Sequence, residues 1–573
     1  MKSDVTGAAL KTRHLIWLIG SFSVFVNLLM LVGPLYMLQV YDRVLSSRSV
    51  ETLIALTALV AFLYFIMGLL DFARLRVASR IAARLQSGME QSVFDAMLRQ
   101  SNGSASTDKF STGLRDLEAV QRLVSSPGYM AIFDLPWTPI FLFGIWLFHP
   151  SLGILALCGG ALLIALAILN QISSRKHILA ANHASFKSNS STDHFVKNAE
   201  TLKSLGMNPG IRARWVQQRE EALEHATTAS DVTGKFSSST KTLRLFLQSL
   251  MLGLGAYLVL LDELTPGAMI VGSILLGRAL APVELAINQW AAFQAALKGW
   301  AAVKNLLTDY PQPQPVMSLP SPKPELAVEN ITVIAPGQEQ ACLKALTFKI
   351  SPGTACGIIG HSGAGKSTLA KALTTAWKLA GGKIRLGGIS IDQLSENDLA
   401  KYIGYLPQSV TLFEGTIAEN IAALDPQIDS DSVVKAAMLA DAHQMILRLP
   451  EGYDTQVSES KSFLSGGQIQ RLGLARALYG DPSFVILDEP NSNLDTNGSQ
   501  ALNNAVRQLK SRGCAVLIIA HRPAALVECD TLLVLEHGTK TAFGPKDAIL
   551  QKMVKNHNEI QSMNKKFQAD EKA

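Results

Sequence analysis

A glycine-rich segment, Gly360 to Thr368, reads GHSGAGKST. It follows the apolar run Ala355 to Ile359, which predicts a buried strand, and it precedes helix-compatible sequence starting at Leu369. In a strand–loop–helix context, GxxxxGK[ST] is typical of a phosphate-binding loop, because its glycines let backbone N–H groups surround phosphate oxygens. The residues that we expect to bind a nucleoside triphosphate here are Gly360, His361, Ser362, Gly363, Ala364, Gly365, Lys366, Ser367 and Thr368.

Two residues of this loop and a later pair of carboxylates predict magnesium-assisted phosphate chemistry. Lys366 is placed to reach the β- and γ-phosphates, and Ser367 offers a hydroxyl to Mg²⁺. The run Phe484 to Leu487 predicts a central strand, and Asp488 and Glu489 follow it. We expect Asp488 to bind Mg²⁺ and Glu489 to act as general base or to polarise the attacking water. Two acids at a strand end are also common on solvated surfaces, and the complete loop upstream is what favours catalysis.

The string LSGGQ, Leu464 to Gln468, lies between the loop and the carboxylates, and a predicted helix follows it. Ser465, Gly466 and Gly467 ahead of a helix offer a hydroxyl and backbone N–H groups to an anion. A Ser-Gly-Gly turn is common at helix starts, but the five-residue string at this place is highly specific. We therefore expect Ser465, Gly466, Gly467 and Gln468 to bind nucleotide.

The composition places these motifs beside a membrane-embedded part. Of the 573 residues, 48% are hydrophobic and 17% are charged, and the mean hydropathy is +0.21, whereas soluble domains carry about 25% charged residues. Six apolar stretches, at roughly 20 residues each, are long enough to cross a bilayer. They are Leu15–Leu38, Thr52–Leu70, Ile132–Phe148, Leu152–Asn170, Leu245–Leu261 and Ala268–Ile287. A disordered, fibrous or disulfide-scaffold protein is excluded, and six buried helices of a soluble protein would be hard to obtain by chance.

The basic residues set the orientation of these spans. Asp71–Ala131 holds eight Lys and Arg and Gln171–Arg244 holds eleven, whereas the three short turns hold only Arg43 and Arg48. The positive-inside rule therefore places the two long segments, both termini and everything after about Ala291 in the cytoplasm. The lipid bilayer is one partner of the chain. The formal net charge of +6 fits juxtamembrane loops better than nucleic-acid binding, so we expect no nucleic acid as a partner.

The chain divides into four predicted parts. Residues 1–310 are a transmembrane domain with six helices, and residues 311–324 are a Pro-rich linker that cannot continue a helix. Residues 325–555 alternate short apolar runs with helical segments, which is typical of an α/β domain, and residues 556–573 are a polar tail. Five cysteines without CxxC spacing predict neither a metal site nor a disulfide framework.

Together these motifs resemble those of an ATP-binding-cassette (ABC) exporter half-transporter, over nearly the whole chain. The resemblance implies the six-span, α-helical type I exporter fold with a cytoplasmic α/β P-loop ATPase domain, and ATP and Mg²⁺ as cofactors. It implies that Gln408 is the Q-loop glutamine that touches Mg²⁺ and water, that His521 is the switch histidine at the γ-phosphate, and that Asp495 is the D-loop aspartate. In this family LSGGQ of a second copy closes each ATP site, so a homodimer is implied.

Four strings are similar to those of the type I protein-secretion branch of these exporters. They are PLYMLQVYDRVL (Pro34–Leu45), FDLPWTPIFL (Phe133–Leu142), SILLGRALAPVE (Ser273–Glu284) and PNSNLD (Pro490–Asp495). That branch exports proteases, lipases and haem- or calcium-binding proteins with C-terminal signals. The resemblance implies a bacterial inner-membrane location, a periplasmic membrane-fusion adaptor, an outer-membrane channel and an unfolded secreted protein as substrate.

Two other functions compete with protein secretion. The first is export of a lipid, drug or small peptide by the same fold without partner proteins. The second is a degenerate ABC protein that binds ATP and serves as a scaffold. Intact Lys366, Asp488, Glu489 and His521 argue against the second.

Some positions leave questions open. Relatives usually place an aromatic residue where Ala335 stands, so adenine is held otherwise or more loosely. In the sixth span, Arg278 either lines the transport path or forms an ion pair, with Glu284 six positions later. Thr112–Val124 and Asn198–Gly206 are candidate short helices that dock on the ATPase domain, and a merely solvated helical face is the alternative.

Overall fold

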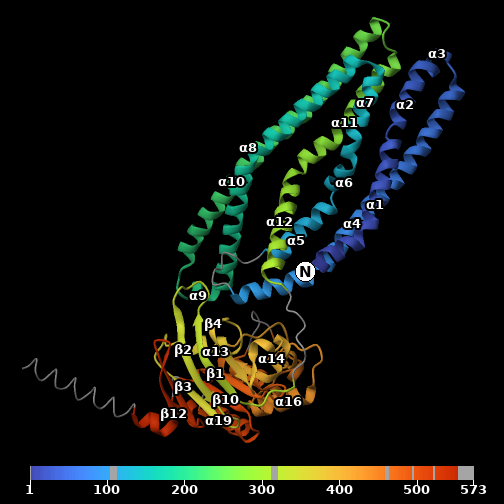
Figure 1. Ribbon diagram of the computed structural model, residues 1–573. Helices are drawn as coiled ribbons and strands as arrows, with labels where there is room; N and C mark the ends of the chain where they lie inside the picture. The colour runs from blue at the N-terminus through green and yellow to red at the C-terminus, as the bar shows by residue number, and fades with distance from the viewer. Residues whose placement is uncertain are drawn as a thin grey trace, which may run out of the picture. The chain divides into compact units, whose positions relative to one another are not determined.

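The computed structural model describes residues 2–103, 112–311, 320–457, 464–492, 494, 496–520 and 523–552 (Figure 1). The chain forms two compact units, one of Met1–Met97 and Ser111–Pro311 and one of Leu98–Phe110 and Gln312–Ala573. Most of the expected Pro-rich linker, residues 312–319, lies outside the described residues.

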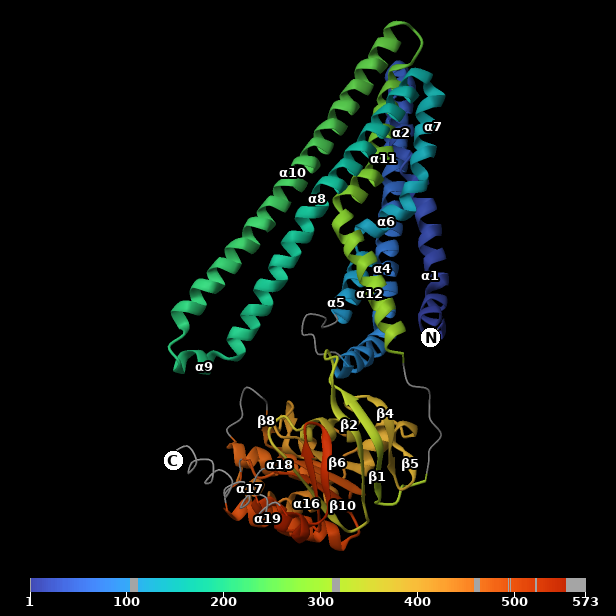
Figure 2. The ribbon, with the colours of Figure 1, turned by 60° about the vertical axis from the view of Figure 1, so that its left-hand side comes forward.

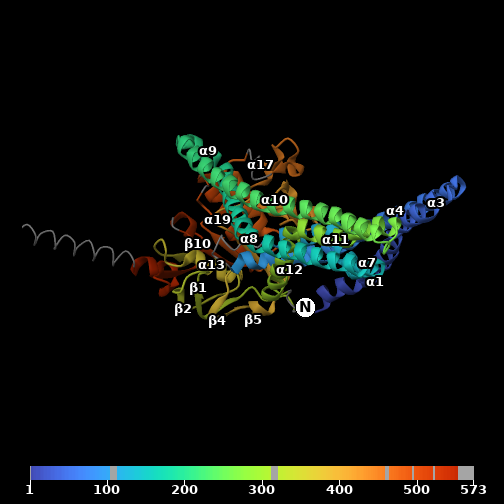
Figure 3. The same cartoon turned by 90° about the horizontal axis from the view of Figure 1, so that it is seen from above.

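The first unit is entirely helical among its described residues (Figures 1 and 2). Its elements are α1 (Lys2–Leu29), α2 (Val32–Gln39), a π-helix (Val40–Val44), α3 (Leu45–Ser47), α4 (Val50–Gly103), α5 (Gly113–Val124), α6 (Pro127–Asp134), a 3₁₀ turn (Leu135–Trp137), α7 (Thr138–Phe148), α8 (Pro150–Lys197), α9 (Ala199–Ser204), α10 (Asn208–Leu260), α11 (Pro266–Asn288) and α12 (Trp290–Asp309). The long helices α8 and α10 lie side by side (Figures 2 and 3).

The six predicted spans are confirmed, because six helical segments are long and apolar enough to cross a membrane. They are Arg13–Ser47, Val50–Gln100, Pro127–Phe148, Pro150–Lys197, Asn208–Leu260 and Pro266–Leu285. In the second segment, Val50–Gln100, the most apolar stretch has no residue buried inside the chain. Its side chains are therefore free to contact lipid or another subunit.

Prolines interrupt two spans that the sequence analysis treated as single helices. Helix α1 ends at Leu29 and α2 begins at Val32, because the ring of Pro34 excludes a hydrogen bond to the carbonyl of Met30. The third span is interrupted by the 3₁₀ turn, which contains Pro136 and is followed by Pro139. It also starts at Pro127, five residues before its predicted beginning.

The second unit is an α/β domain, as expected. Its strands are β1 (Leu326–Ile334), β2 (Ala341–Ile350), β3 (Ala355–Ile359), β4 (Leu379–Leu386), β5 (Ile389–Ser390), β6 (Ile403–Leu406), β7 (Gly415–Thr416), β8 (Gln456–Val457), β9 (Phe484–Asp488), β10 (Ala515–Ile519), β11 (Thr531–Glu536) and β12 (Thr539–Pro545). Its α-helices are α13 (Lys366–Leu373), α14 (Glu396–Tyr402), α15 (Ile417–Ile421), α16 (Ser430–Leu439), α17 (His443–Leu447), α18 (Gly466–Leu478) and α19 (Thr496–Ser511).

A six-stranded sheet in the order β12-β11-β3-β10-β9-β6 forms the centre of this unit. Neighbouring strands from β11 to β6 pair in parallel, and every residue of β9 and β10 is buried. Alternate side chains enter two cores, as a strand with both faces covered requires. Val485 faces a core with α16 and α18, whereas Ile486 faces a core with α13 and the antiparallel sheet β2-β1-β4-β5.

Candidate functional site

The predicted phosphate loop joins the carboxyl end of β3 to α13. Gly363 and Gly365 have positive φ angles of 80° and 96°, which glycine adopts without steric cost. The loop curls around Lys366, whose side chain Nζ donates to the carbonyl oxygens of Gly360 (2.8 Å) and His361 (2.9 Å). Because a Cβ on Gly360 would lie 2.3 Å from the Leu535 carbonyl oxygen, only glycine fits there.

A cavity of about 280 Å³ opens over this loop. Its lining contains most of the loop residues predicted to bind phosphate, namely Ser362, Gly363, Gly365, Lys366, Ser367 and Thr368. Gln408, two residues after β6, and Glu489, next after β9, line the same cavity. Three segments far apart in the sequence thus meet here, since parallel strands bring their carboxyl ends to one sheet edge. Gly360, His361 and Ala364 shape the loop outside this lining.

Asp488 lies at the end of β9 and is only 2% exposed. Its carboxylate interacts with the Ser367 side chain, whereas its Oδ1 atom is buried without a hydrogen-bond partner among the described residues. Burial raises the pKa of Asp488, Glu489 raises it further, and Ser367 and Lys366 oppose the rise. A buried carboxylate oxygen without a partner beside a serine hydroxyl fits a hard divalent cation such as Mg²⁺.

Burial and the two carboxylates have opposite effects on the pKa of Lys366. Burial lowers the pKa of Lys366, and the negative charges of Glu489 and Asp488 act in the opposite direction. The two acids and the lysine therefore form one electrostatic group, and shifted pKa values of this kind are common at functional sites.

Glu489 has a strained backbone. Its φ angle is 50°, in the left-handed region, where a side chain other than glycine costs about 1 kcal/mol or more. The N–H group of Glu489 donates to the carbonyl oxygen of Ile519 on β10 (2.9 Å), which holds this conformation. Glu489 lines the same cavity as the phosphate loop.

The LSGGQ string forms the start of α18, as predicted. Ser465 is the N-cap and accepts from the backbone N–H of Gln468, whose side-chain oxygen accepts from the backbone N–H of Ser465. This reciprocal pair is a capping box. Ser465, Gly467 and Gln468 line a second cavity, of about 660 Å³, while Gly466 begins the helix itself. The two cavities share no lining residue.

Two of the predicted site residues, Asp495 and His521, lie outside the described residues. Strand β10 ends at Ile519, two residues before His521, and its register pairs Ile519 with Asp488 on one side and with Ile358 on the other. The roles of Asp495 and His521 stay predictions.

The sequence analysis missed two residues near the site. Cys342, near the start of β2, lines the phosphate-loop cavity, and its Sγ donates to the side-chain oxygen of Gln338 (3.3 Å). Asn491, two residues after Glu489, is 5% exposed, and neither atom of its amide has a hydrogen-bond partner among the described residues. Cys342 gave no signal because it follows a loop without charged or glycine-rich motifs, whereas an Asn two residues after the predicted Asp488–Glu489 pair was a usable signal.

Glu284, which the sequence analysis considered beside Arg278, has an ion-pair partner on another helix. The carboxylate of Glu284 forms its ion pair with Arg244 on α10 (2.8 Å). The ion pair of Glu284 therefore links α10 to α11, and it does not fix the role of Arg278.

A six-span helical membrane unit and a P-loop ATPase unit with an SGGQ helix on one chain define an ABC exporter. Residues 16–281 match the family model of the ABC transporter transmembrane region, and residues 343–492 match that of the ABC transporter. The chain belongs to the ABC transporter family, in the group of type I secretion ATP-binding proteins.

Two curated relatives and one solved structure illustrate this placement. The type I secretion system ATP-binding protein PrsD of Rhizobium meliloti is 40% identical over 94% of this chain and 92% of its own. The exotoxin translocation ATP-binding protein PaxB of Pasteurella aerogenes is 28% identical over 95% of this chain and 77% of its own. An ATP-bound bacterial Atm1-family ABC exporter matches with a TM-score of 0.79, over 94% of this chain and 96% of that one. At 21% identity this last likeness concerns the fold.

Proposed function

We propose that this chain is the inner-membrane ABC transporter of a type I secretion system, which hydrolyses ATP to export an unfolded protein carrying a C-terminal signal. The observation that carries the proposal is the 40% identity, across 94% of the chain, to a type I secretion ATP-binding protein. The cavity that joins the phosphate loop, Gln408 and Glu489 supplies the ATPase that such a motor needs.

Each residue of the cavity has a role in this proposal. The loop N–H groups and Lys366 bind the phosphates, and Ser367, Asp488 and Gln408 hold Mg²⁺, which neutralises phosphate charge when bound. Glu489 accepts a proton from the attacking water or polarises it. By family resemblance, His521 contacts the γ-phosphate and Asp495 belongs to the D-loop.

The complete site needs a second copy of the chain. The SGGQ residues line a different cavity from the phosphate loop of the same copy, so they are available to the nucleotide of a partner. We infer a homodimer in which Ser465, Gly466, Gly467 and Gln468 of each copy close the other copy's ATP site.

Secretion across two membranes needs further partners. The basic residues favour a cytoplasmic ATPase unit and cytoplasmic termini, and only short turns then face the periplasm. We infer that a periplasmic adaptor docks on those turns or on the lipid-facing sides of the helices, and that it recruits an outer-membrane channel. Helices α5 and α9 stay our candidates for docking on the ATPase domain.

The test is reconstituted secretion in a Gram-negative host. The cargo is a Gly-Asp-rich repeat protein with its own C-terminal signal, and the same protein without that signal is the control. We expect cargo in the medium only when the chain, an adaptor and an outer-membrane channel are all present, and none with Glu489→Gln. Secretion that persists without either partner contradicts the proposal. Transport of a lipid or drug by proteoliposomes of the chain alone would favour the small-molecule alternative.

A further inference from the structure

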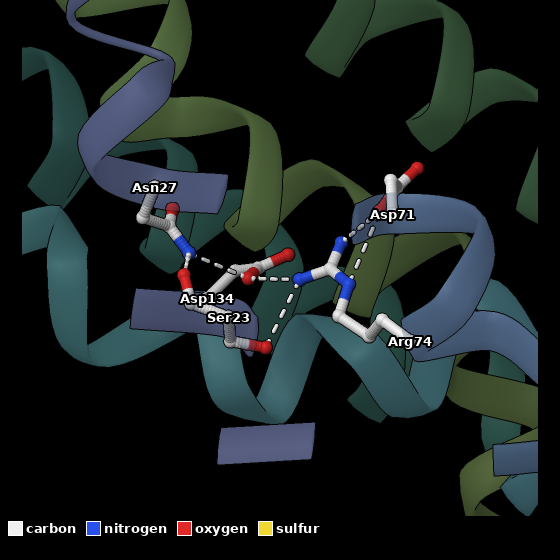
Figure 4. Close-up of polar contacts among 5 residues, drawn as sticks. All are labelled: Ser23, Asn27, Asp71, Arg74 and Asp134. Carbon is white, nitrogen blue, oxygen red and sulfur yellow. Dashed lines mark hydrogen bonds and ion pairs between the residues drawn. The ribbon is translucent and has the colours of Figure 1, made fainter. Parts of the chain in front are cut away.

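A polar cluster links three helices of the membrane unit (Figure 4). It consists of Ser23 and Asn27 on α1, Asp71 and Arg74 on α4, and Asp134 at the end of α6, and we call it the Asp134 cluster. The Oδ1 atom of Asp134 accepts from Arg74 Nη1 (2.7 Å) and from Asn27 Nδ2 (2.8 Å). Arg74 also donates to the Ser23 hydroxyl (3.1 Å), and its Nη2 donates to Asp71 Oδ1 (2.7 Å).

The centre of the cluster is removed from solvent. Arg74 is 5% exposed, Ser23 and Asn27 are buried, and the Asp134 side chain is 14% exposed, whereas the Asp71 side chain is 45% exposed. A guanidinium among apolar helices is costly unless it is paired and hydrogen-bonded. Arg74 Nε also donates to Asp71 Oδ1 (3.1 Å), so Asp71 holds Arg74 from within α4, whereas Asp134 and Ser23 join it to the other two helices.

Asp134 stands where the third span is interrupted. Helix α6 ends at Asp134, and the 3₁₀ turn with Pro136 leads into α7. A positive charge near the C-terminus of a helix interacts favourably with the helix dipole. Arg74 therefore stabilises the end of α6 in addition to pairing with the carboxylate of Asp134. Beside the break, Thr138 Oγ1 donates to the carbonyl oxygen of Ala279 (3.0 Å) on α11, a continuous helix that contains Pro282. Pro136 and Pro139 have no N–H group to donate, so the joint between α6 and α7 lacks two backbone hydrogen bonds that a continuous helix would have.

The other end of α6 is joined closely to α5. Only Ser125 and Ser126 separate the two helices. Helix α5 packs tightly on α12, because a Cβ on Gly299 would lie 2.6 Å from the Asp116 carbonyl oxygen. A displacement of α5 is thus passed to α6, and the Asp134 cluster is the polar connection from α6 to α1 and α4.

We propose that Arg74 and Asp134 are positioning residues of the transport cycle. They make α6 move together with α1 and α4 while α6 changes its angle to α7 at the break, so that a displacement of α5 reaches the first two spans. The proposal rests on the proposed function only in that ATP drives the displacement. Without the cluster the ATPase still turns over, but the spans no longer follow it.

The first test measures distances and needs no cargo. Spin labels are placed at Phe72→Cys on α4 with Ile132→Cys on α6, and at Ile132→Cys with Phe143→Cys on α7, since all three side chains are exposed. Labelled protein is diluted with unlabelled protein so that the distances lie within one copy. Between the nucleotide-free and the ATP–vanadate states, we expect the 72–132 distance to stay constant and the 132–143 distance to shift. A shift of the 72–132 distance, or a constant 132–143 distance, would overturn the proposal.

The second test separates coupling from stability in the full secretion assay. Asp134→Asn removes the charge that joins Arg74 to α6, and Asp71→Asn is the matched control, because it removes an ion pair of Arg74 within α4 and leaves the contacts between helices in place. We expect Asp134→Asn to export about tenfold less cargo per ATP hydrolysed, with an unchanged KM for ATP, and Asp71→Asn to match wild type. Equal losses in both variants, or wild-type export by Asp134→Asn, contradict the proposal. If wild type exports no cargo, the secretion proposal fails, and the distance test still shows whether α6 moves together with α4.

Discussion

At the scale of single residues, Lys366 and Glu489 line the same cavity, but we expect their replacement to have different effects. Loss of Lys366 should weaken ATP binding, and loss of Glu489 should slow ATP turnover. Lys366→Ala removes both the charge that meets phosphate and the bonds that hold the Gly360 and His361 carbonyls, so we expect ATP affinity to fall by roughly 10- to 100-fold. Glu489→Gln keeps binding and lowers turnover by roughly 10²–10⁴-fold. Titration calorimetry and phosphate release measure the two effects. Lys371→Ala, on the same helix, is the control with near wild-type affinity, and rapid turnover by Glu489→Gln would disprove its assignment as the base.

The lowered pKa of Lys366 gives a second prediction at this scale. Because burial lowers the pKa, Lys366 carries a neutral amine at lower pH than an ordinary lysine, whose pKa is about 10.4. The pH midpoint of its acylation, followed by mass spectrometry of its peptide, should lie below that value, and ATP should protect it. Glu489→Gln removes a charge that raises this pKa, so the midpoint should move further down. A midpoint at or above that of exposed lysines contradicts the prediction.

At the scale of helices and strands, local sequence patterns predicted single elements, but they did not predict the contacts between elements that lie far apart in the sequence. The strand Ala355–Ile359 was predicted with its observed ends, because a turn before this apolar run and a glycine loop after it mark where the strand begins and ends. The interruption at Leu135–Trp137 was missed, since hydropathy does not register a change of backbone angle at proline. The partners Arg74 and Asp134 lie on different helices, and the sequence holds no local signal that pairs them. The same is true of Arg244 and Glu284.

A contact between the π-helix Val40–Val44 and the start of α11 gives a prediction at this scale. Asp42, in the π-helix, accepts from the Thr265 hydroxyl (2.9 Å) and from the backbone N–H of Gly267 (3.0 Å), and so caps α11 from a distance. Asp42→Ala leaves the Gly267 N–H without its acceptor, while Thr265 still caps the helix through the Ala268 N–H, and we expect a loss of about 1–2 kcal/mol in the free energy of unfolding. Thermal unfolding in detergent measures it. Asp42→Asn keeps an acceptor and should lose less, and equal stability of all three proteins would show that the contact contributes nothing.

At the scale of the whole molecule, the remaining prediction concerns which side of the membrane each segment faces. The basic count places residue 175 in the cytoplasm and the turn that contains residue 43 outside. Both Arg175 and Arg43 are exposed, so a cysteine at either position is open to a reagent. A membrane-impermeant maleimide applied to intact spheroplasts should label Arg43→Cys and should label Arg175→Cys only after lysis.

The native cysteines make this experiment simple to interpret. Burial raises the pKa of Cys356, Cys514 and Cys529 to about 12, so these thiols stay protonated at neutral pH and react slowly. Only Cys158 and Cys342, which are not fully buried, need replacement by alanine. Labelling of Arg175→Cys in intact spheroplasts would show that the topology is inverted, and the ATPase unit would then lie outside the cytoplasm together with the long helical segments. The motor proposal would then fail together with the orientation, because ATP is available only on the cytoplasmic side.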